Sequence, residues 1–349
     1  MKTVKLAIIG AGGMANQHAR KFKEIKNCTV VAAADVDFAK AKKFAADHGL
    51  PQAYASADEL LDRAEVDAVA VVVPDKFHAA VAIQCLKAGK HVLCEKPLAM
   101  NYAEAQKMVR AAAAARRVNM VNLSYRDWPV IQAVAKLARR GGVGEVRHVE
   151  ASYAQGWLNG GAWREPGLLW RLSSRHGSQG VLGDLGVHIV DFATYPVGPV
   201  RRVFSRLKAF PKARGNRVGE YVLDANDSAF LNVEFANGAL GSIYTSRWCG
   251  GHANRLYLKI CGTKATVEID SEVATDTYRI RRVKKHETWP KDPWVTVQCP
   301  PTPNNYQRFI KSIVSGGPQE QPDFKRGAEV QKVLDACFAA DKSQRSVGV

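Results

Sequence analysis

The chain has 349 residues, of which 46% are hydrophobic and 24% charged, so it is long enough for two domains and is not a disordered chain. Its seven cysteines are scattered without a C-x-x-C pair, which excludes a zinc ribbon or disulfide scaffold and indicates a reducing compartment. The net charge of +17 is spread as short basic pairs rather than one block. We therefore expect a solvated surface and no nucleic-acid partner, with attraction of anionic ligands as the alternative.

No segment has the pattern of a targeting or membrane-spanning sequence. The apolar run at residues 6–9 is only as long as a strand and ends at Gly10, whereas a signal peptide has a longer apolar region and a cleavage site. No stretch approaches the roughly 20 apolar residues of a membrane span. The expected location is cytoplasmic, without a membrane partner.

The first third of the chain alternates predicted strands and helices. Apolar runs at 4–9, 29–34, 68–73, 91–94 and 119–124 predict strands. Helices are predicted after Gly10, from about 77 to 88, and from 101 to about 115, where Asn101 and Glu104 form a capping-box pattern. Continuous apolar strands separated by helices are typical of a parallel sheet covered on both faces.

The remainder of the chain is predicted to be rich in strands without intervening helices. The expected strands are 146–153, 200–210, 228–235, 239–246, 255–261 and 266–269, and a final helix runs from about 325 to 341. Apolar and polar residues alternate in 228–235, and Asn237-Gly238 predicts a hairpin turn after it. This pattern favours an antiparallel sheet.

A glycine-rich turn is the first feature that carries chemistry. Gly10, Gly12 and Ala15 form a G-x-G-x-x-A motif between the first strand and a helix, where the glycines let backbone approach a pyrophosphate. The helix N-terminus offers N–H groups to phosphates. Asp35 ends the second strand and would accept ribose hydroxyls while repelling a 2′-phosphate, which favours NAD over NADP. Asp37 could share this role, and an unliganded glycine turn is the alternative.

Polar residues follow the carboxyl ends of the predicted parallel strands, where ligands of open α/β sheets bind. Lys96, between Glu95 and Pro97, could polarise a substrate oxygen, although a surface Glu–Lys pair before a proline turn is an equal alternative. The residues expected to line this edge are Asp35, Asp75, Lys76, His78, Glu95, Lys96, Tyr125 and Arg126.

The segment 180–191 is predicted to be a helix with two faces. Its apolar stripe is formed by Leu182, Leu185, Ile189 and Phe192, and its polar stripe by Asp184, His188 and Asp191. Gly183 and Gly186 each disfavour a helix by about 1 kcal/mol relative to alanine, and close approach of a ligand would explain them. A carboxylate one turn from a histidine can orient a general base. A structural Asp–His pair and a metal site are the alternatives.

Together these motifs resemble the Gfo/Idh/MocA oxidoreductases, which include glucose–fructose oxidoreductase and inositol dehydrogenases. The matching segments, in the family's order, are 10–15, Asp35, 74–78, 89–97 and 183–188. The resemblance implies an α/β Rossmann domain over 1–124. It also implies an α+β domain over 125–349 for substrate binding and oligomerisation, with a large, mostly antiparallel open sheet and a C-terminal helix that can pack back on the first domain.

The resemblance also implies NAD(P)-dependent oxidation or reduction of a sugar, cyclitol or related polyol, and we expect NAD-dependent hydride transfer between a secondary hydroxyl of a sugar, glycoside or cyclitol and nicotinamide. By motif match, Lys96, Asp184 and His188 are the catalytic trio, and the substrate contacts are Arg126, Trp170, Arg171, Asp184 and His188. The expected cofactor contacts are Gly10, Gly12, Gly13, Met14, Ala15, Asp35, Pro74, His78, Glu95 and Lys96. No metal ion is expected. The alternatives are an NAD-dependent glycoside hydrolase with transient oxidation and a cofactor-binding regulator.

A homodimer or homotetramer joined through the C-terminal sheet is the expected assembly. A large antiparallel sheet with one face uncovered by helices needs a partner for that face. The apolar candidates for the uncovered face are Tyr244, Trp248, Leu256 and Leu258.

Overall fold

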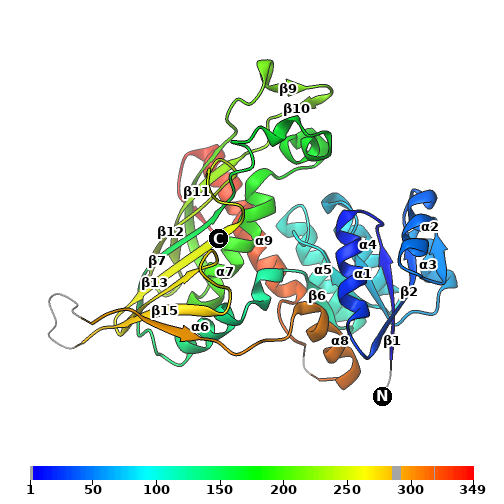
Figure 1. Cartoon of the computed structure of the whole chain (residues 1–349), viewed down its shortest axis with the longest axis horizontal. Coiled ribbons are helices and arrows are strands. Elements are labelled where there is room, and N and C mark those ends of the chain that lie inside the picture. Colours follow the sequence, from blue (N-terminus) through cyan, green and yellow to red (C-terminus); the bar gives the residue numbers. More distant parts are fainter. Residues whose placement is uncertain (1–2, 285–291, 318) are drawn as a thin grey trace. The chain divides into compact units, whose positions relative to one another are not determined.

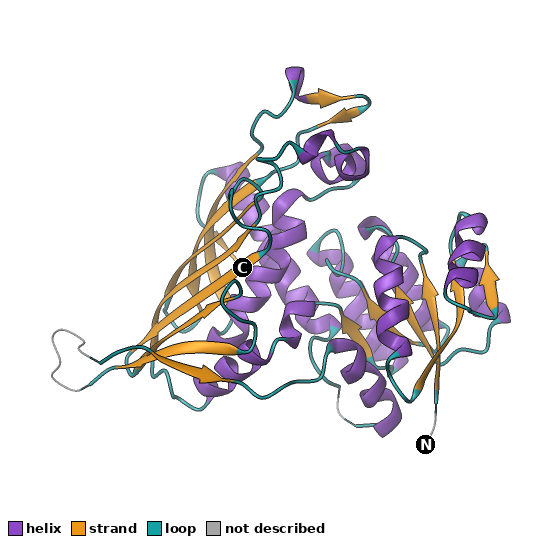
Figure 2. Ribbon diagram, viewed as in Figure 1, coloured by secondary structure: helices purple, strands orange, loops and turns teal. Residues whose placement is uncertain are grey.

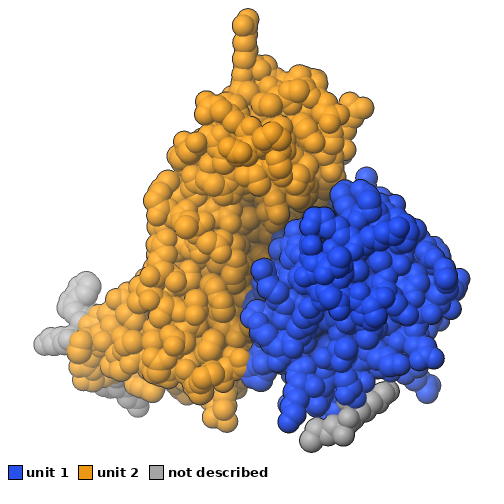
Figure 3. Space-filling model, turned by 45° about the vertical axis from the view of Figure 1, so that its right-hand side comes forward, with its two compact units in different colours: residues 1–124, 303–331 blue, residues 125–302, 332–349 orange. Residues whose placement is uncertain are grey.

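The computed structural model describes residues 3–284, 292–317 and 319–349, which group into two compact units (Figures 1 and 3). Unit 1 contains residues 1–124 and 303–331, and unit 2 contains residues 125–302 and 332–349. The expected second domain ran from 125 to the end of the chain, whereas residues 303–331 group with unit 1. The expected domain boundaries, 1–124 and 125–349, stay a prediction.

Unit 1 is a parallel six-stranded sheet with helices on its faces (Figure 2). The strand order β3-β2-β1-β4-β5-β6 reverses direction at β1, which is the Rossmann arrangement. Helices α1 and α8 pack together against this sheet, and α4 packs with α5. The strands are β1 (Val4–Ile9), β2 (Cys28–Ala34), β3 (Gln52–Tyr54), β4 (Ala68–Val71), β5 (His91–Cys94) and β6 (Asn119–Val121). The helices are α1 (Gly13–Lys23), α2 (Phe38–Asp47), α3 (Ala57–Arg63), α4 (His78–Lys87), α5 (Tyr102–Ala115) and α8 (Asn305–Ser315).

Unit 2 is built on a nine-stranded sheet in the order β16-β15-β14-β13-β7-β12-β11-β8-β17. Its neighbours are antiparallel except for β7 with β12, so the expected mostly antiparallel sheet is confirmed. The strands are β7 (Val146–Ala154), β8 (Val200–Lys208), β11 (Ser228–Phe235), β12 (Leu240–Ser246), β13 (Arg255–Gly262), β14 (Ala265–Asp270), β15 (Thr277–Arg282), β16 (Val295–Gln298) and β17 (Val347–Gly348). A separate small hairpin joins β9 (Arg217–Val218) and β10 (Tyr221–Val222).

Helices cover one face of the large sheet (Figures 1 and 2). Helix α7 (Val187–Val197) lies against β7, β12 and β13, and α6 (Pro129–Arg139) lies against β14 and β15. The end of α9 (Phe324–Ser343) is attached where the Ser205 hydroxyl donates to the Cys337 carbonyl. No helix in the described part of the chain has the length and apolar character needed to cross a bilayer.

Part of the prediction for the uncovered face of the large sheet is wrong, because three of the four expected residues do not lie on it. Leu256 and Leu258 are fully buried within the chain, so they belong to the helix-covered face. Trp248 lies beyond the end of β12 and packs against the apolar cluster that contains Leu158. Among the four expected residues, Tyr244 is on the uncovered face, where its ring stacks on exposed Phe230.

A buried polar network connects the two chain segments of unit 1. Glu95, at the end of β5, accepts hydrogen bonds from the Asn122 side chain at 2.6 Å and contacts the His18 ring at 2.7 Å. The Asn122 amide also reaches the Tyr306 hydroxyl on α8. Burial acts to raise the pKa of Glu95, but the hydrogen bond and charge of His18 and the hydrogen bond from Asn122 outweigh it and lower the pKa from 4.5 to about 2. This carboxylate therefore stays ionised inside the unit.

We predict that Glu95→Gln destabilises the protein by about 3 kcal/mol near pH 7, because it removes a charge that buried partners hold. The folded pKa is below the unfolded one, so the stabilisation is present well above pH 4.5 and is lost as the pH falls toward 2. The difference in unfolding free energy between wild type and variant should therefore shrink by about 1 kcal/mol between pH 7 and pH 3.5. Urea titrations at the two pH values measure it.

Glu65→Gln is the matched control. The Glu65 side chain is 91% exposed and pairs with the partly exposed Lys5, so its loss should change the unfolding free energy by less than about 1 kcal/mol at either pH. A Glu95→Gln effect that is small, or equal at both pH values, would contradict the prediction.

Candidate active site

The glycine-rich turn leaves room where a pyrophosphate would lie. Gly10 has φ of +99°, and a Cβ there would come within 2.4 Å of the Val72 carbonyl oxygen, so only glycine fits. A Cβ on Gly12 or Gly13 would meet no atom within 4 Å. Among the residues that the structure describes, no side chain caps the start of α1, where Met14 is exposed and Ala15 is fully buried. These features fit a dinucleotide, whose phosphates the N–H groups of the first turn would bind.

Asp35 is fixed beside that turn. Its two carboxylate oxygens accept hydrogen bonds from the backbone N–H groups of Ala11 at 2.8 Å and Asp37 at 2.9 Å. Each oxygen keeps acceptor capacity for a further donor, such as a ribose hydroxyl. The Asp37 side chain instead caps α2 by accepting from the Lys40 N–H, which lowers the pKa of Asp37. The contacts thus favour Asp35 over Asp37 for ribose binding.

Two of the expected cofactor residues, His78 and Glu95, use their polar groups for hydrogen bonds within unit 1. His78 is fully buried, and its ring nitrogens contact the Pro97 carbonyl at 2.7 Å and the Val73 carbonyl at 2.9 Å. This side chain connects the segment before Pro74 to the turn that follows Lys96. Glu95 is 6% exposed and accepts from the Lys96 backbone N–H. These contacts give His78 and Glu95 a positioning role around half-buried Lys96, and a direct cofactor contact stays a prediction for them.

The segment with Asp184 is helical, as expected, but it begins with a widened turn. Residues Leu182–Gly186 form a π-helix that leads directly into α7. A Cβ on Gly183 would come within 2.3 Å of the Gln179 Cβ, and one on Gly186 within 2.8 Å of the Leu182 side chain. Packing within the chain therefore explains these glycines, and the ligand that we expected to explain them is not required. Such single π-turns are frequent at functional sites.

The Asp184 carboxylate holds two guanidinium groups. Its Oδ2 accepts from Arg171 at 2.9 Å and from Arg247 at 2.8 Å. The Arg247 side chain is 1% exposed and lies over the Trp157 ring, while Arg171 lies over the half-exposed Trp170 ring. Sequence reasoning missed Arg247, because this residue follows β12 outside any motif. Asp184, Trp170 and Arg171 thus lie together, and their contact with a substrate stays a prediction.

His188 lies in α7 beside a network of hydroxyl groups. Its ring packs edge-on against Tyr125, with centroids 4.7 Å apart. The Tyr125 hydroxyl contacts the Tyr153 hydroxyl at 2.5 Å and accepts from the Asn254 amide at 2.9 Å. Burial raises the pKa of Tyr153, so this phenol stays neutral. Sequence reasoning missed Tyr153 and Asn254, because neither belongs to a recognisable motif.

Arg126 and Asp191 form a separate buried pair. The Arg126 side chain is 1% exposed, and its Nε donates to Asp191 at 3.0 Å. Its guanidinium also lies 3.6 Å from the centre of the Tyr195 ring. Asp191 therefore serves this pair rather than extending the polar stripe of Asp184 and His188. The expected substrate contact of Arg126 stays a prediction that its burial does not favour.

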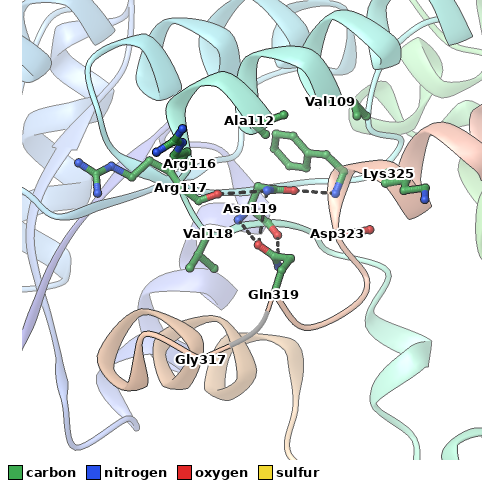
Figure 4. Close-up of a pocket in the computed structure, with 12 residues that line it drawn as sticks. Val109, Ala112, Arg116, Arg117, Val118, Asn119, Gly317, Gln319, Asp323 and Lys325 are labelled. Atoms are coloured by element: carbon green, nitrogen blue, oxygen red, sulfur yellow. Dashed lines mark hydrogen bonds between the residues drawn. The ribbon is translucent and has the colours of Figure 1, made fainter.

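A cavity of about 370 Å³ lies elsewhere in unit 1 (Figure 4). Arg116, Arg117 and Lys325 border it, beside the Asn119 side chain that accepts from the Phe324 N–H. It lies at the beginning of β6, whereas the expected ligand residues follow the ends of the strands, and its lining includes none of them. Among the described residues, no cluster of three or more histidine, cysteine or acidic side chains could hold a metal ion.

Comparison with known proteins identifies relatives over the whole chain. Residues 4–123 match the oxidoreductase family model with an NAD-binding Rossmann fold, and residues 131–268 match the GFO/IDH/MocA C-terminal domain. Glucose-6-phosphate 3-dehydrogenase of Bacillus subtilis is 31% identical over 99% of this chain and 98% of its own. Levoglucosan dehydrogenase of Pseudarthrobacter phenanthrenivorans is 26% identical over 100% and 99%.

A solved structure gives the same picture of the fold. Levoglucosan dehydrogenase in complex with NADH and L-sorbose has a TM-score of 0.88 and 25% identity, covering 100% of this chain and 99% of its own. The family resemblance of the motifs is therefore confirmed. The chain belongs to the Gfo/Idh/MocA family of NAD-dependent oxidoreductases.

Proposed function

We propose that the protein oxidises a secondary hydroxyl of a sugar, glycoside or cyclitol, with NAD as hydride acceptor. The observation that supports this best is the constellation of unit 2, where His188 and an arginine-held Asp184 lie on one helical segment beside a neutral hydroxyl network. Such groups can hold a polyol and take its proton. Two relatives are named as sugar or sugar-phosphate dehydrogenases, which points in the same direction.

The charge state of each side chain decides its role in the proposed reaction. NAD, when bound, supplies the hydride acceptor. His188 takes the hydroxyl proton, because an imidazole is partly unprotonated near neutral pH. Lys96 stabilises the developing alkoxide through its positive charge. Asp184 accepts a hydrogen bond from a neighbouring substrate hydroxyl and helps to orient His188.

We predict that His188→Ala lowers kcat by about 10²–10⁴-fold, the usual contribution of a general base. Lys96→Ala should lose a comparable or larger factor. The affinity for NAD should change much less in either variant. NADH absorbance during steady-state turnover, over a panel of sugars, glycosides and inositols, measures kcat, and net NADH formation also separates this activity from transient-oxidation hydrolysis.

Glu65→Gln is again the control, because the Glu65 side chain is 91% exposed and lies outside both the expected site and the uncovered face of the large sheet. It should keep wild-type kcat. If His188→Ala retained near wild-type kcat with normal NAD affinity, His188 would not be the base, and Lys96 would become the leading candidate.

Asp35 underlies the proposed preference for NAD. Its carboxylate is fixed at the end of β2, where a 2′-phosphate would introduce a second negative charge at short range. The net charge of +17 attracts any phosphate, but salt screens this diffuse field more strongly than a local contact.

We predict that NAD binds at least about tenfold more tightly than NADP, and that Asp35→Asn narrows this gap because it removes the local charge. Fluorescence titration with both cofactors measures the two Kd values. Asp37→Asn removes the same charge two residues away and should leave the gap unchanged. Tighter NADP binding by the wild type, or a larger effect of Asp37→Asn, would overturn the role of Asp35.

The uncovered face of the large sheet supports a homodimer or homotetramer. Phe230 and Leu240 are each about 60% exposed there, and Phe230 stacks on Tyr244. The strand register places charges of both signs on the same face, among them Arg206, Glu150, Lys259, Glu268 and Arg279. An identical face can complement such a mixture in a two-fold interface. We therefore propose that a second copy of the chain covers this face.

We predict that light scattering at micromolar concentration gives a dimer or tetramer, and that the double substitution Phe230→Asp and Leu240→Asp gives a folded monomer. Introduced charges would be buried without partners in the interface. Val273→Asp alters another highly exposed apolar side chain and should not change the mass. A monomeric wild type would refute the proposal.

A further inference from the structure

The arginine pair around Asp184 carries more positive charge than its partners neutralise. Arg171 and Arg247 each have Asp184 as a carboxylate partner, at 2.9 and 2.8 Å. Neither guanidinium has another carboxylate within 4 Å among the residues that the structure describes. One negative charge therefore serves two positive ones.

The buried ion pair of Lys212 and Asp227, which acts on Arg247, does not remove this excess. Lys212 and Asp227 form a salt bridge of 2.7 Å with both side chains fully buried. Asp227 also attracts Arg247 electrostatically, so it belongs to the same group of charges. Its Lys212 partner cancels its charge, and the cluster as a whole keeps three positive groups against two negative ones.

Arg171 is the member of the cluster that can receive a ligand. Its side chain is 34% exposed, and its guanidinium lies 4.7 Å from the centre of the Trp170 ring. One of its nitrogens, Nη1, donates to Asp184, whereas its Nε and Nη2 donate to no described residue. Those two nitrogens form the planar edge that binds a carboxylate or phosphate through two parallel hydrogen bonds.

The buried member of the pair holds the receiving edge in place. Arg247 donates from Nη1 to the Arg171 carbonyl and from Nη2 to Asp184. It thereby fixes both the backbone of Arg171 and the carboxylate that orients the Arg171 side chain. A guanidinium that is fixed before binding loses less conformational freedom when a ligand arrives.

We propose that the substrate of this site carries an anionic group, a carboxylate or a phosphate, which binds the free edge of Arg171. This inference rests on the proposed function, because it names the substrate class of the same site. An anion would neutralise the excess charge of the cluster. A neutral sugar would instead cover Arg171 without providing a counter-charge, which is unfavourable for a desolvated guanidinium.

The test compares three sugars that differ only at one carbon: D-glucose, D-glucuronate and D-glucose 6-phosphate. Calorimetric titration into the wild-type protein with saturating NADH, at 0.15 M ionic strength, gives their Kd values without turnover. We expect at least one anionic sugar to bind roughly 10- to 100-fold more tightly than D-glucose, and the two anions distinguish a carboxylate site from a phosphate site.

Arg171→Gln should abolish that preference, so that the Kd values of the three sugars come within about threefold of one another, while Arg247 still holds Asp184. Arg175→Gln is the matched control, because it removes the same charge from an exposed position in the next turn of the same segment. It should keep the preference. Thermal unfolding of both variants confirms that they are folded.

The inference is overturned if D-glucose binds as tightly as both anions, if none of the three sugars binds, or if the preference survives Arg171→Gln. An equal loss in Arg175→Gln would also overturn it, because a diffuse surface field would then be responsible. Turnover is a separate readout. If anions bind in an Arg171-dependent way but no NADH forms, the proposed dehydrogenase activity is refuted and the anion site is not. If neutral sugars are oxidised equally well by the wild type and by Arg171→Gln, the dehydrogenase activity is supported and the anionic substrate is refuted.

Discussion

The double ion pair of Asp184 is the interaction on which the organisation of unit 2 depends. Arg247 is almost completely removed from solvent, and an unpaired buried guanidinium would be strongly destabilising. Asp184 provides the counter-charge from the π-turn before α7, and Arg247 in turn fixes the backbone of Arg171. One carboxylate therefore connects the end of β12, the short 3-10 helix that contains Trp170 and Arg171, and the helix that carries His188.

Unit 1 uses a buried carboxylate in a comparable way. Glu95 joins α1 through His18 and the end of β6 through Asn122, and it accepts from the backbone of Lys96. His78 connects the same turn to the end of the preceding strand segment. The residue proposed to stabilise the alkoxide is thus supported by ionised or hydrogen-bonded groups that the substrate need not touch.

Sequence periodicity predicted the elements whose burial pattern is strong. The runs at β1, β5 and β11 were located to the residue, because continuous or strictly alternating apolar residues define their ends. It did not predict β3 and α3, which have three and seven residues, because such short elements depend on tertiary packing, and it also missed the ten-residue α2. The π-turn was also missed, because an α-helical wheel assigns Asp184, His188 and Asp191 to one stripe, whereas Asp191 pairs with Arg126.

The partners of the motif residues were beyond the reach of sequence reasoning for a physical reason. Asp184 and Arg247 are separated by 63 positions, and Glu95 and His18 by 77, so only the folded chain brings them together. A motif marks a residue whose chemistry is constrained, but the charge that tunes this residue comes from side chains without any local pattern. The net charge says even less about the site, because +17 is a sum over the whole chain. The excess positive charge at Arg171 arises because Arg171 and Arg247 share the carboxylate of Asp184. Substrate preference in this protein is therefore expected to follow from the contacts around Asp184, and not from the glycine and histidine motifs that identify the family.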